Sequence, residues 1–289
     1  MPDSWRLKLD RAEKHLSELR IGIGEYVQKR PYEAVQVVGG GNCRKHAGYD
    51  CGGSWTLHIT EQPDPQLAVI LGDALFDIRS ALDHLAVALA PPGRRRQARF
   101  PIEAKNIWAK EGRRYVVRDP KARKSWRTTV EGMAPEAVAF IESLQPYRKA
   151  TPEKDTLFTL NRLENADKHR QLTLFAPGLQ RAHYWGSARG RTIELTVERP
   201  DAFVVEDGAE IAHFGGRGGP PLQYDEVQVQ VSGALLVTTK IADPNVRRGQ
   251  RGEYAPIGAL VETLIASARD LIFPGLEPYT WARLHPPAP

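Results

Sequence analysis

The fold is decided by residues 64–90, DPQLAVILGDALFDIRSALDHLAVALA. Asp64 is a good helix cap, Pro65 suits the first helical turn, and Pro91 and Pro92 follow the last residue of the stretch. Apolar side chains recur every three or four residues, at Leu71, Leu75, Ile78, Leu82, Leu85 and Leu89. This spacing is typical of the buried face of a helix. The stretch therefore predicts one long helix that ends near Ala90.

Ionisable side chains interrupt the same stretch, so its composition excludes a membrane span. They are Asp73, Asp77, Arg79, Asp83 and His84. Residues 1–16 contain no apolar core of a signal peptide, and two cysteines in 289 residues cannot form a disulfide framework. With 41% hydrophobic and 26% charged residues, the chain is not a disordered one. We therefore expect a cytoplasmic protein that does not contact a membrane.

The segments around the long helix predict further helices and a small hairpin. Residues 5–29 have the apolar spacing of an amphipathic helix, and residues 35–38 and 55–59 resemble two strands joined by a glycine-rich loop. Beyond the long helix we expect shorter helices near 105–114 and over 134–144. Another helix is expected from 151 to about 172.

After Pro177 apolar and polar residues alternate, as in half-buried strands. The candidate strands are 193–197, 202–205, 211–214, 227–231 and 235–239, and residues 257–272 return to helical spacing. We predict an α+β fold in which residues 1–176 form a mainly helical, bundle-like domain with the small β-hairpin inserted. Residues 177–289 are expected to form an antiparallel sheet of four to six strands with a C-terminal helix, packed as one globular unit.

Positive charge is concentrated in residues 94–127, the basic segment. It holds thirteen Lys or Arg against three acids, whereas the whole chain has a net charge of +5. Such a block favours a surface that binds a polyanion, and RNA is the partner that we expect; a solvated linker is the alternative. The candidate phosphate contacts are Arg113, Arg114, Arg123 and Lys124. The aromatic residues Trp108, Tyr115 and Trp126 either stack on unpaired bases or anchor the segment to the core.

Two clusters of polar residues interrupt the helical pattern. At about 100° per residue, Asp77 and His84 fall on the side of the long helix opposite its leucines. The second cluster is 161–170, NRLENADKHR, where Asn161, Asn165 and Lys168 share a helix face with leucines. Ordinary solvent exposure and the helix dipole are the simpler explanations of the two clusters. The functional hypothesis is that both clusters line one water-accessible hollow.

Several motifs resemble an uncharacterised bacterial family. They are RSALDHLA (79–86), FPI (100–102), LQPY (144–147) and NADKHR (165–170). Separately, the run from Arg79 to His84 resembles the R-x4-H signature of HEPN-type ribonucleases. Those proteins are helical bundles, often dimeric, that cleave RNA without a metal. This resemblance implies a metal-independent endoribonuclease or RNA-binding protein that forms a homodimer and uses no cofactor.

The resemblance also implies roles for single residues. His84 would transfer protons at the ribose hydroxyl or the leaving oxygen, and Arg79 would contact the scissile phosphate. The other candidate substrate-binding residues of the two clusters are Asp77, Asp83, Asn161, Asn165, Lys168 and His169.

Two alternatives to this hypothesis stay open. In the first, the polar clusters form a buried hydrogen-bonded network that fixes helix packing, and the chain is a non-catalytic binding or scaffold protein. In the second, the chain holds a metal ion. Its ligands would be Asp77, His84, Asp167 and His169 between helices, or Cys43, His46 and Cys51 in the glycine-rich loop.

Overall fold

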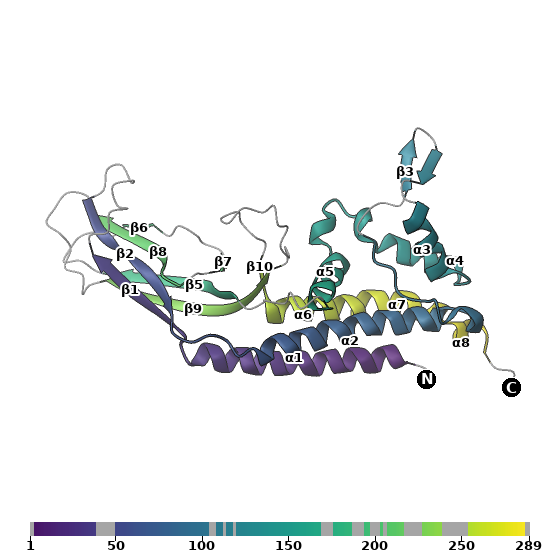
Figure 1. The fold of residues 1–289 in the computed structure, drawn as a ribbon, viewed down its shortest axis with the longest axis horizontal. Helices are drawn as coiled ribbons and strands as arrows, with labels where there is room; N and C mark the ends of the chain where they lie inside the picture. The colour runs from purple at the N-terminus through teal and green to yellow at the C-terminus, as the bar shows by residue number, and fades with distance from the viewer. Residues whose placement is uncertain are drawn as a thin grey trace. The chain divides into compact units, whose positions relative to one another are not determined.

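A computed structural model describes most of the chain, and Figure 1 shows its fold. The described residues are 3–38, 50–103, 108–111, 114–117, 120–168, 176–186, 194–196, 203–204, 207–216, 227–238 and 254–286. Their helices and antiparallel strands confirm the predicted α+β class. The chain divides into two compact units. The helical unit comprises Met1–Leu19, Val69–Leu172 and Gly258–Pro289, and the sheet unit comprises Arg20–Ala68 and Thr173–Ile257.

This division differs from a boundary at residue 176. The hairpin of β1 (Tyr32–Val38) and β2 (Asp50–Ile59) extends a sheet whose other strands come from the second half of the chain. Helix α6 (Ile257–Ala266), which was expected to pack with the sheet, belongs from Gly258 onward to the helical unit. One cause of the first difference is that the open edge of an isolated hairpin leaves N–H and C=O groups unpaired, and distant strands satisfy them.

The helical unit is built around α2 (Gln66–Leu89). Its other helices are α1 (Ser4–Gln28, in part), α3 (Pro120–Val130), α4 (Pro135–Ser143), α5 (Thr156–Lys168), α6, α7 (Phe273–Leu276) and α8 (Trp281–Leu284). Short turns of 3-10 helix lie at η2 (Pro92–Arg94), η3 (Pro146–Arg148), η4 (Pro152–Lys154) and η7 (Glu277–Tyr279), and a π-helical turn, η6, spans Ser267–Ile272. Strands β3 (Trp108–Glu111) and β4 (Arg114–Val117) form a separate hairpin where a helix was expected.

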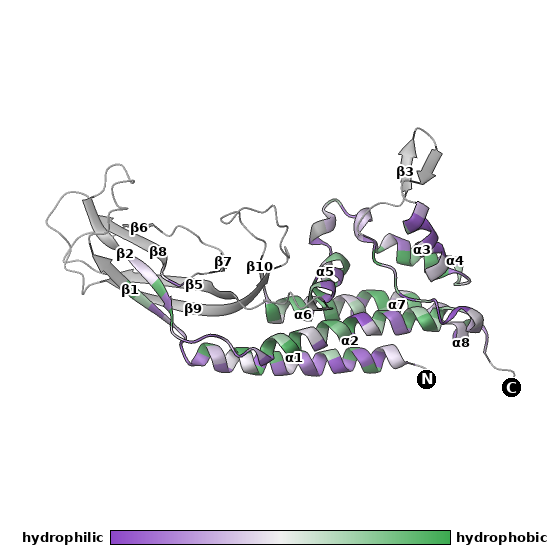
Figure 2. Ribbon diagram, in the orientation of Figure 1, coloured by the Kyte–Doolittle hydropathy of each residue, from purple (hydrophilic) through white to green (hydrophobic). Residues whose placement is uncertain are grey.

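The apolar stripe of α2 lies in the core, as its spacing predicted. Its six leucine and isoleucine positions from Leu71 to Leu89 are each at most 1% exposed. Figure 2 shows α2 and α6 with many hydrophobic residues, whereas α3 is hydrophilic along most of its length. Two residues after the end of α3, Gly132 has a φ of +80°, a conformation that glycine adopts without strain.

The sheet unit contains two four-stranded antiparallel sheets. The first has the strand order β1-β2-β8-β6, with β8 (Ala209–Gly216) and β6 (Glu194–Thr196). The second has the order β10-β9-β5-β7, with β10 (Tyr254–Pro256), β9 (Val227–Thr238), β5 (Ala176–Gly186) and β7 (Phe203–Val204). β1 of the first sheet contacts β9 of the second. The single sheet expected after residue 177 is therefore two sheets, one of which includes the N-terminal hairpin.

Candidate functional site

Asp77 is buried on the face of α2 that packs against α1. Its side chain is 4% exposed, and its Oδ1 lies 3.0 Å from Lys8 Nζ. Oδ2 lies 3.3 Å from Arg11 Nε and 3.6 Å from His15 Nε2. A carboxylate that leaves water needs such partners, because burying an unpaired charge is costly. Asp77 therefore acts as a packing contact between two helices.

His84 also faces α1. Its Nδ1 lies 3.0 Å from Ser4 Oγ, which is hydrogen-bonding distance, and the imidazole is half-buried. Its Nε2 makes no hydrogen bond or ion pair with another described residue. The ring is therefore oriented by the first turn of α1, and one nitrogen stays available for a further partner.

Arg79 and Asp83 hold the backbone of Phe100 between them. Arg79 Nη2 donates a hydrogen bond of 2.7 Å to the Phe100 carbonyl, and Asp83 Oδ1 accepts one of 2.9 Å from the Phe100 N–H. The two side chains also form an ion pair, with 3.1 Å between Arg79 Nη2 and Asp83 Oδ1. Arg79 Nη1 is buried and makes no hydrogen bond within the described residues. In this arrangement the guanidinium positions a loop instead of facing solvent.

Gln145 holds the next residues of the same loop. Its amide is fully buried, and Nε2 donates to the carbonyls of Pro101 at 3.0 Å and Ile141 at 2.9 Å. Its Oε1 accepts a hydrogen bond of 2.8 Å from the Glu103 N–H. Together with Arg79 and Asp83, this glutamine fixes residues 100–103, which we call the clamped segment.

The clamped segment brings three of these sequence motifs into contact. Arg79 and Asp83 come from RSALDHLA, residues 100–102 are FPI, and Gln145 belongs to LQPY. In the same motif, burial raises the pKa of Tyr147 to about 12, so its hydroxyl stays protonated near neutral pH and donates to Glu142. These three motifs meet through backbone hydrogen bonds, which is a structural role.

The second polar cluster lies on α5 and only part of it is described. Asn161 is half-buried and Asn165 is exposed, and neither side chain makes a hydrogen bond with another described residue. The buried polar side chains described in α5 are those of Thr159, at 7% exposure, and Glu164, at 5% exposure, and Glu164 was not among the predicted site residues. Its spacing from the buried Leu157 and Leu160 follows the helical repeat and could have identified it. The side chain of Lys168 and all of His169 lie outside the described residues.

The polar clusters of α2 and α5 were expected to share one hollow. Within the part of the chain that the structure describes, no hydrogen bond or ion pair joins Asp77, Arg79, Asp83 or His84 to Asn161 or Asn165. The described contacts instead connect the α2 cluster to α1 and to the clamped segment. The convergence of the two clusters therefore stays a prediction.

In the basic segment, the structure decides between the two alternatives for Trp126. Trp126 is 5% exposed, so it anchors α3 to the core and is not available to stack on bases. Arg113 lies outside the described residues, and of Trp108, Arg114 and Tyr115 only the backbone is described. Their predicted contacts with RNA stay predictions.

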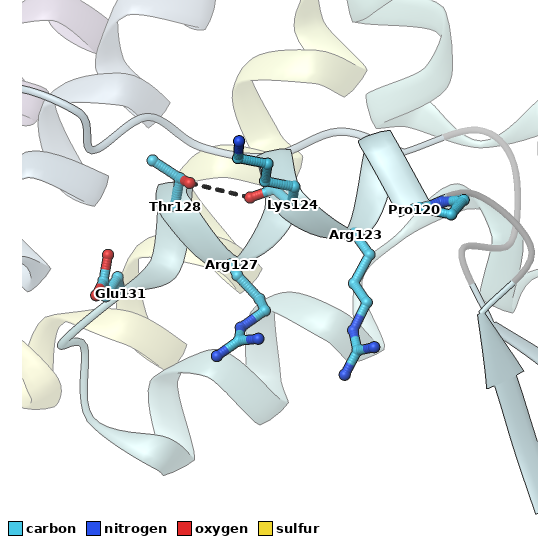
Figure 3. A pocket seen from close by; sticks show the side chains of 6 residues that line it. All are labelled: Pro120, Arg123, Lys124, Arg127, Thr128 and Glu131. Atoms are coloured by element: carbon cyan, nitrogen blue, oxygen red, sulfur yellow. Dashed lines mark hydrogen bonds between the residues drawn. The ribbon is translucent and has the colours of Figure 1, made fainter.

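A first basic hollow, the α3 hollow, lies beside α3 (Figure 3) and has a volume of about 520 Å³. It is lined by Pro120, Arg123, Lys124, Arg127, Thr128 and Glu131. In Figure 3 the side chains of Arg123 and Arg127 extend to the same side of the helix, whereas Lys124 and Thr128 point away from them. This follows from the helical repeat, because residues four apart lie on one face.

A second basic hollow, the four-cation hollow, adjoins the first and has a volume of about 560 Å³. It lies between α3 and the loop that follows η2, and Lys124 and Thr128 line both hollows. Its lining residues are Arg96, Gln97, Arg99, Lys121, Lys124, Ser125, Thr128 and Thr129. These described residues include four Lys or Arg and no acid.

The described charges around these hollows are mostly of one sign. Glu131 is the one acid among the lining residues, and its carboxylate pairs with Arg94 at 2.8 Å. Among the described residues, no ion pair engages the side chains of Arg96, Arg99, Lys124 or Arg127. Like charges held close together repel one another, so an anionic ligand would be attracted to this surface.

Only part of this surface was in the predicted site. Arg123 and Lys124 were predicted as substrate-binding residues, whereas Arg96, Arg99, Lys121 and Arg127 were predicted only as members of the basic segment. The missed signal is the run RRRQAR (94–99), which follows a proline-glycine turn and lies before α3 in the chain. The sequence cannot show that this run folds against α3, because the clamped segment sets its path.

Comparisons of the chain with known protein families, with curated proteins and with solved structures found no match. No described helix is both long and apolar enough to cross a membrane. Among the described side chains, no group of three or more His, Cys, Asp or Glu is placed to hold a metal ion. Of the proposed metal ligands, Cys43, His46 and His169 and the side chains of Cys51 and Asp167 lie outside that part of the chain.

Proposed function

We propose that the protein binds RNA through the surface formed by the α3 hollow and the four-cation hollow. The observation that carries this proposal is the lining of the two adjoining hollows. It contains six Lys or Arg side chains and one acid: Arg96, Arg99, Lys121, Arg123, Lys124, Arg127 and Glu131. Sequence-independent binding of nucleic acids comes mainly from Lys and Arg on backbone phosphates.

Concave basic surfaces of this kind suit a single strand. Lys124 and Thr128 line both hollows, so a strand that passes over these two residues would have cations on both sides. Arginine offers planar, forked donors that match the oxygens of a phosphate. Four of the lining residues are arginines, and Arg94, which pairs with Glu131, is a fifth beside them. The surface therefore supports contacts to the RNA backbone, without requiring any particular base.

The catalytic form of this function stays a prediction. The contacts of Arg79 with Phe100 and Asp83 favour a positioning role for its guanidinium, and His84 keeps one nitrogen available. The homodimer and the cytoplasmic location likewise stay predictions. Incubation of purified protein with RNA in the presence of a chelator, followed by electrophoresis, separates cleavage from binding alone.

Fluorescence anisotropy with a labelled single-stranded RNA of about twelve nucleotides tests the proposal. Six phosphate contacts would give a slope of about −4 in a plot of log K against log salt concentration between about 50 and 200 mM. The variant Lys124→Gln/Arg127→Gln should bind more weakly and reduce the slope by about 1.4, because each lost contact removes about 0.7.

A matched control removes two charges elsewhere. Lys14 and Lys149 are exposed and line neither hollow, so Lys14→Gln/Lys149→Gln should leave the affinity and the salt slope almost unchanged. Equal losses in both double variants would mean that overall charge alone attracts the RNA, and would contradict the proposed surface. An absence of binding at low salt would also overturn it.

A further inference from the structure

The two hollows differ in the charges of the described residues that line them. Among the described residues, those that line the four-cation hollow include Arg96, Arg99, Lys121 and Lys124 and no acid. The α3 hollow includes the carboxylate of Glu131. An internal phosphodiester of RNA carries one negative charge, whereas a phosphate monoester carries about 1.5 to 2 near pH 7. The more highly charged group gains more from the hollow without an acid.

The hydroxyl groups of the four-cation hollow are not equivalent. Thr128 Oγ1 donates to the carbonyl of Lys124 at 3.0 Å, and Thr129 Oγ1 donates to the carbonyl of Ser125 at 2.6 Å. The hydroxyl of Ser125 makes no hydrogen bond with another described residue. The Ser125 hydroxyl can therefore donate a hydrogen bond to a phosphate oxygen, alongside the guanidinium and ammonium groups of this hollow.

The hollow also has a fixed wall. Arg96 and Arg99 lie on the loop that ends at Phe100, whose backbone N–H and carbonyl are both held by α2 side chains. At its other end, the loop is ordered by a hydrogen bond of 2.8 Å from the Arg94 N–H to the Pro91 carbonyl. Two cations from a held loop thus face two cations from α3 across one space.

We propose that the four-cation hollow binds the terminal phosphate monoester of an RNA strand, while the strand continues along the α3 hollow. This inference rests on the proposed function and narrows it to strands that end in a phosphate. The terminal group would be held by the forked donors of Arg96 and Arg99, with Lys121 and Lys124 opposite them. Either end of a strand can carry such a group, so the chemistry is common to 5′- and 3′-phosphates.

Binding of three RNAs of one sequence tests this inference. They carry a 5′-phosphate, a 3′-phosphate or hydroxyl groups at both ends, with the fluorophore on an internal base. We expect one phosphorylated strand to bind about tenfold more tightly than the strand with two hydroxyl ends. The preferred strand shows which end the hollow receives.

Paired variants assign the preference to one hollow. Arg96→Gln/Arg99→Gln should abolish the preference, so that the three strands bind alike. Arg127→Gln, in the α3 hollow, should weaken binding of all three strands and leave the preference in place. Because these side chains are exposed, circular dichroism should show unchanged folding of each variant.

Each result bears on one of the two proposals. Equal affinities of the wild-type protein for all three strands would overturn the terminal-phosphate site and leave RNA binding intact. A preference that persists in Arg96→Gln/Arg99→Gln would also overturn it, because the end would then be recognised elsewhere. If no strand binds, the proposed function itself fails, and this inference fails with it.

Discussion

Charged side chains play opposite parts in two regions of the helical unit. Around α2 they are paired and partly or fully buried: Asp77 contacts three basic residues of α1, and Arg79 and Asp83 hydrogen-bond to the Phe100 backbone. On α3 and the preceding loop they are exposed and gathered with the same sign around two hollows. The first arrangement contributes to folding, whereas the second has a cost in stability that a ligand would remove.

The largest expected effect concerns Trp126, which lies among the cations of α3 but belongs to the core. Trp126→Ala should lower the free energy of unfolding by about 3–5 kcal/mol, because it leaves a large cavity under the helix. Urea denaturation followed by circular dichroism measures this. A change smaller than about 0.5 kcal/mol would instead be typical of an exposed aromatic residue, and would contradict the assignment of this side chain to the core.

Removal of the buried glutamine of the LQPY motif should have the next largest effect. Gln145→Ala should cost about 2–4 kcal/mol of unfolding free energy, because the Pro101 carbonyl and the Glu103 N–H lose their partner inside the protein. The exposed Gln97 is a matched control, and Gln97→Ala should change stability by less than about 0.5 kcal/mol. Thermal unfolding of both variants provides the comparison, and equal melting temperatures of the two variants would contradict the structural role of the Gln145 hydrogen bonds.

The Arg79–Asp83 pair should behave as one unit. We expect Arg79→Ala and Asp83→Ala each to cost about 1–3 kcal/mol, since each leaves one Phe100 backbone group without its partner. A double-mutant cycle from urea unfolding should show a coupling energy of at least about 0.5 kcal/mol. Additive losses would contradict the shared clamp. Full stability of Arg79→Ala together with loss of RNA cleavage would favour the catalytic role instead.

The smallest expected effect is a gain in stability, opposite in sign to the losses expected from the buried and paired side chains. Arg127→Gln removes like-charge repulsion with Arg123 and Lys124, four and three residues earlier on α3. We expect a gain in stability of about 0.2–0.5 kcal/mol per pair at low salt, and a smaller gain when salt is added. Thermal unfolding at two salt concentrations measures it. A loss of stability at low salt would mean that Arg127 has a structural partner.

The apolar pattern predicted the elements of the helical unit better than their polar contacts. The leucine spacing of residues 71–89 located α2 and its buried face, because helix periodicity is a local property. The polar residues of the same helix could not be assigned in this way. Whether Asp77 faces solvent or α1 depends on where the cations of Lys8 and Arg11 lie, which is a tertiary property.

In the sheets and the basic hollows, too, local sequence patterns predicted elements but not their tertiary contacts. The alternation at β1 and β2 indicated strands, but strand pairing with β8 depends on residues far away in the chain. Charge counting identified residues 94–127 as a basic segment, yet it ranked Arg123 and Lys124 as contacts and did not single out Arg96 or Arg99. The position of those two residues beside α3 depends on the hold of Arg79 and Asp83 on Phe100, which is a tertiary contact.

That anchored loop has a consequence for affinity. A long, free loop loses conformational entropy when a ligand orders it, and this loss subtracts from the binding free energy. Before any ligand arrives, residues 91–99 are held at Phe100, and their first residues form a turn closed by the hydrogen bond from the Arg94 N–H to the Pro91 carbonyl. Ordering would then be confined mainly to the arginine side chains, each with about 2 kcal/mol of rotamer entropy. Loosening the anchor through Asp83→Ala should therefore slow capture of the strand or hasten its release, although Asp83 lines neither hollow.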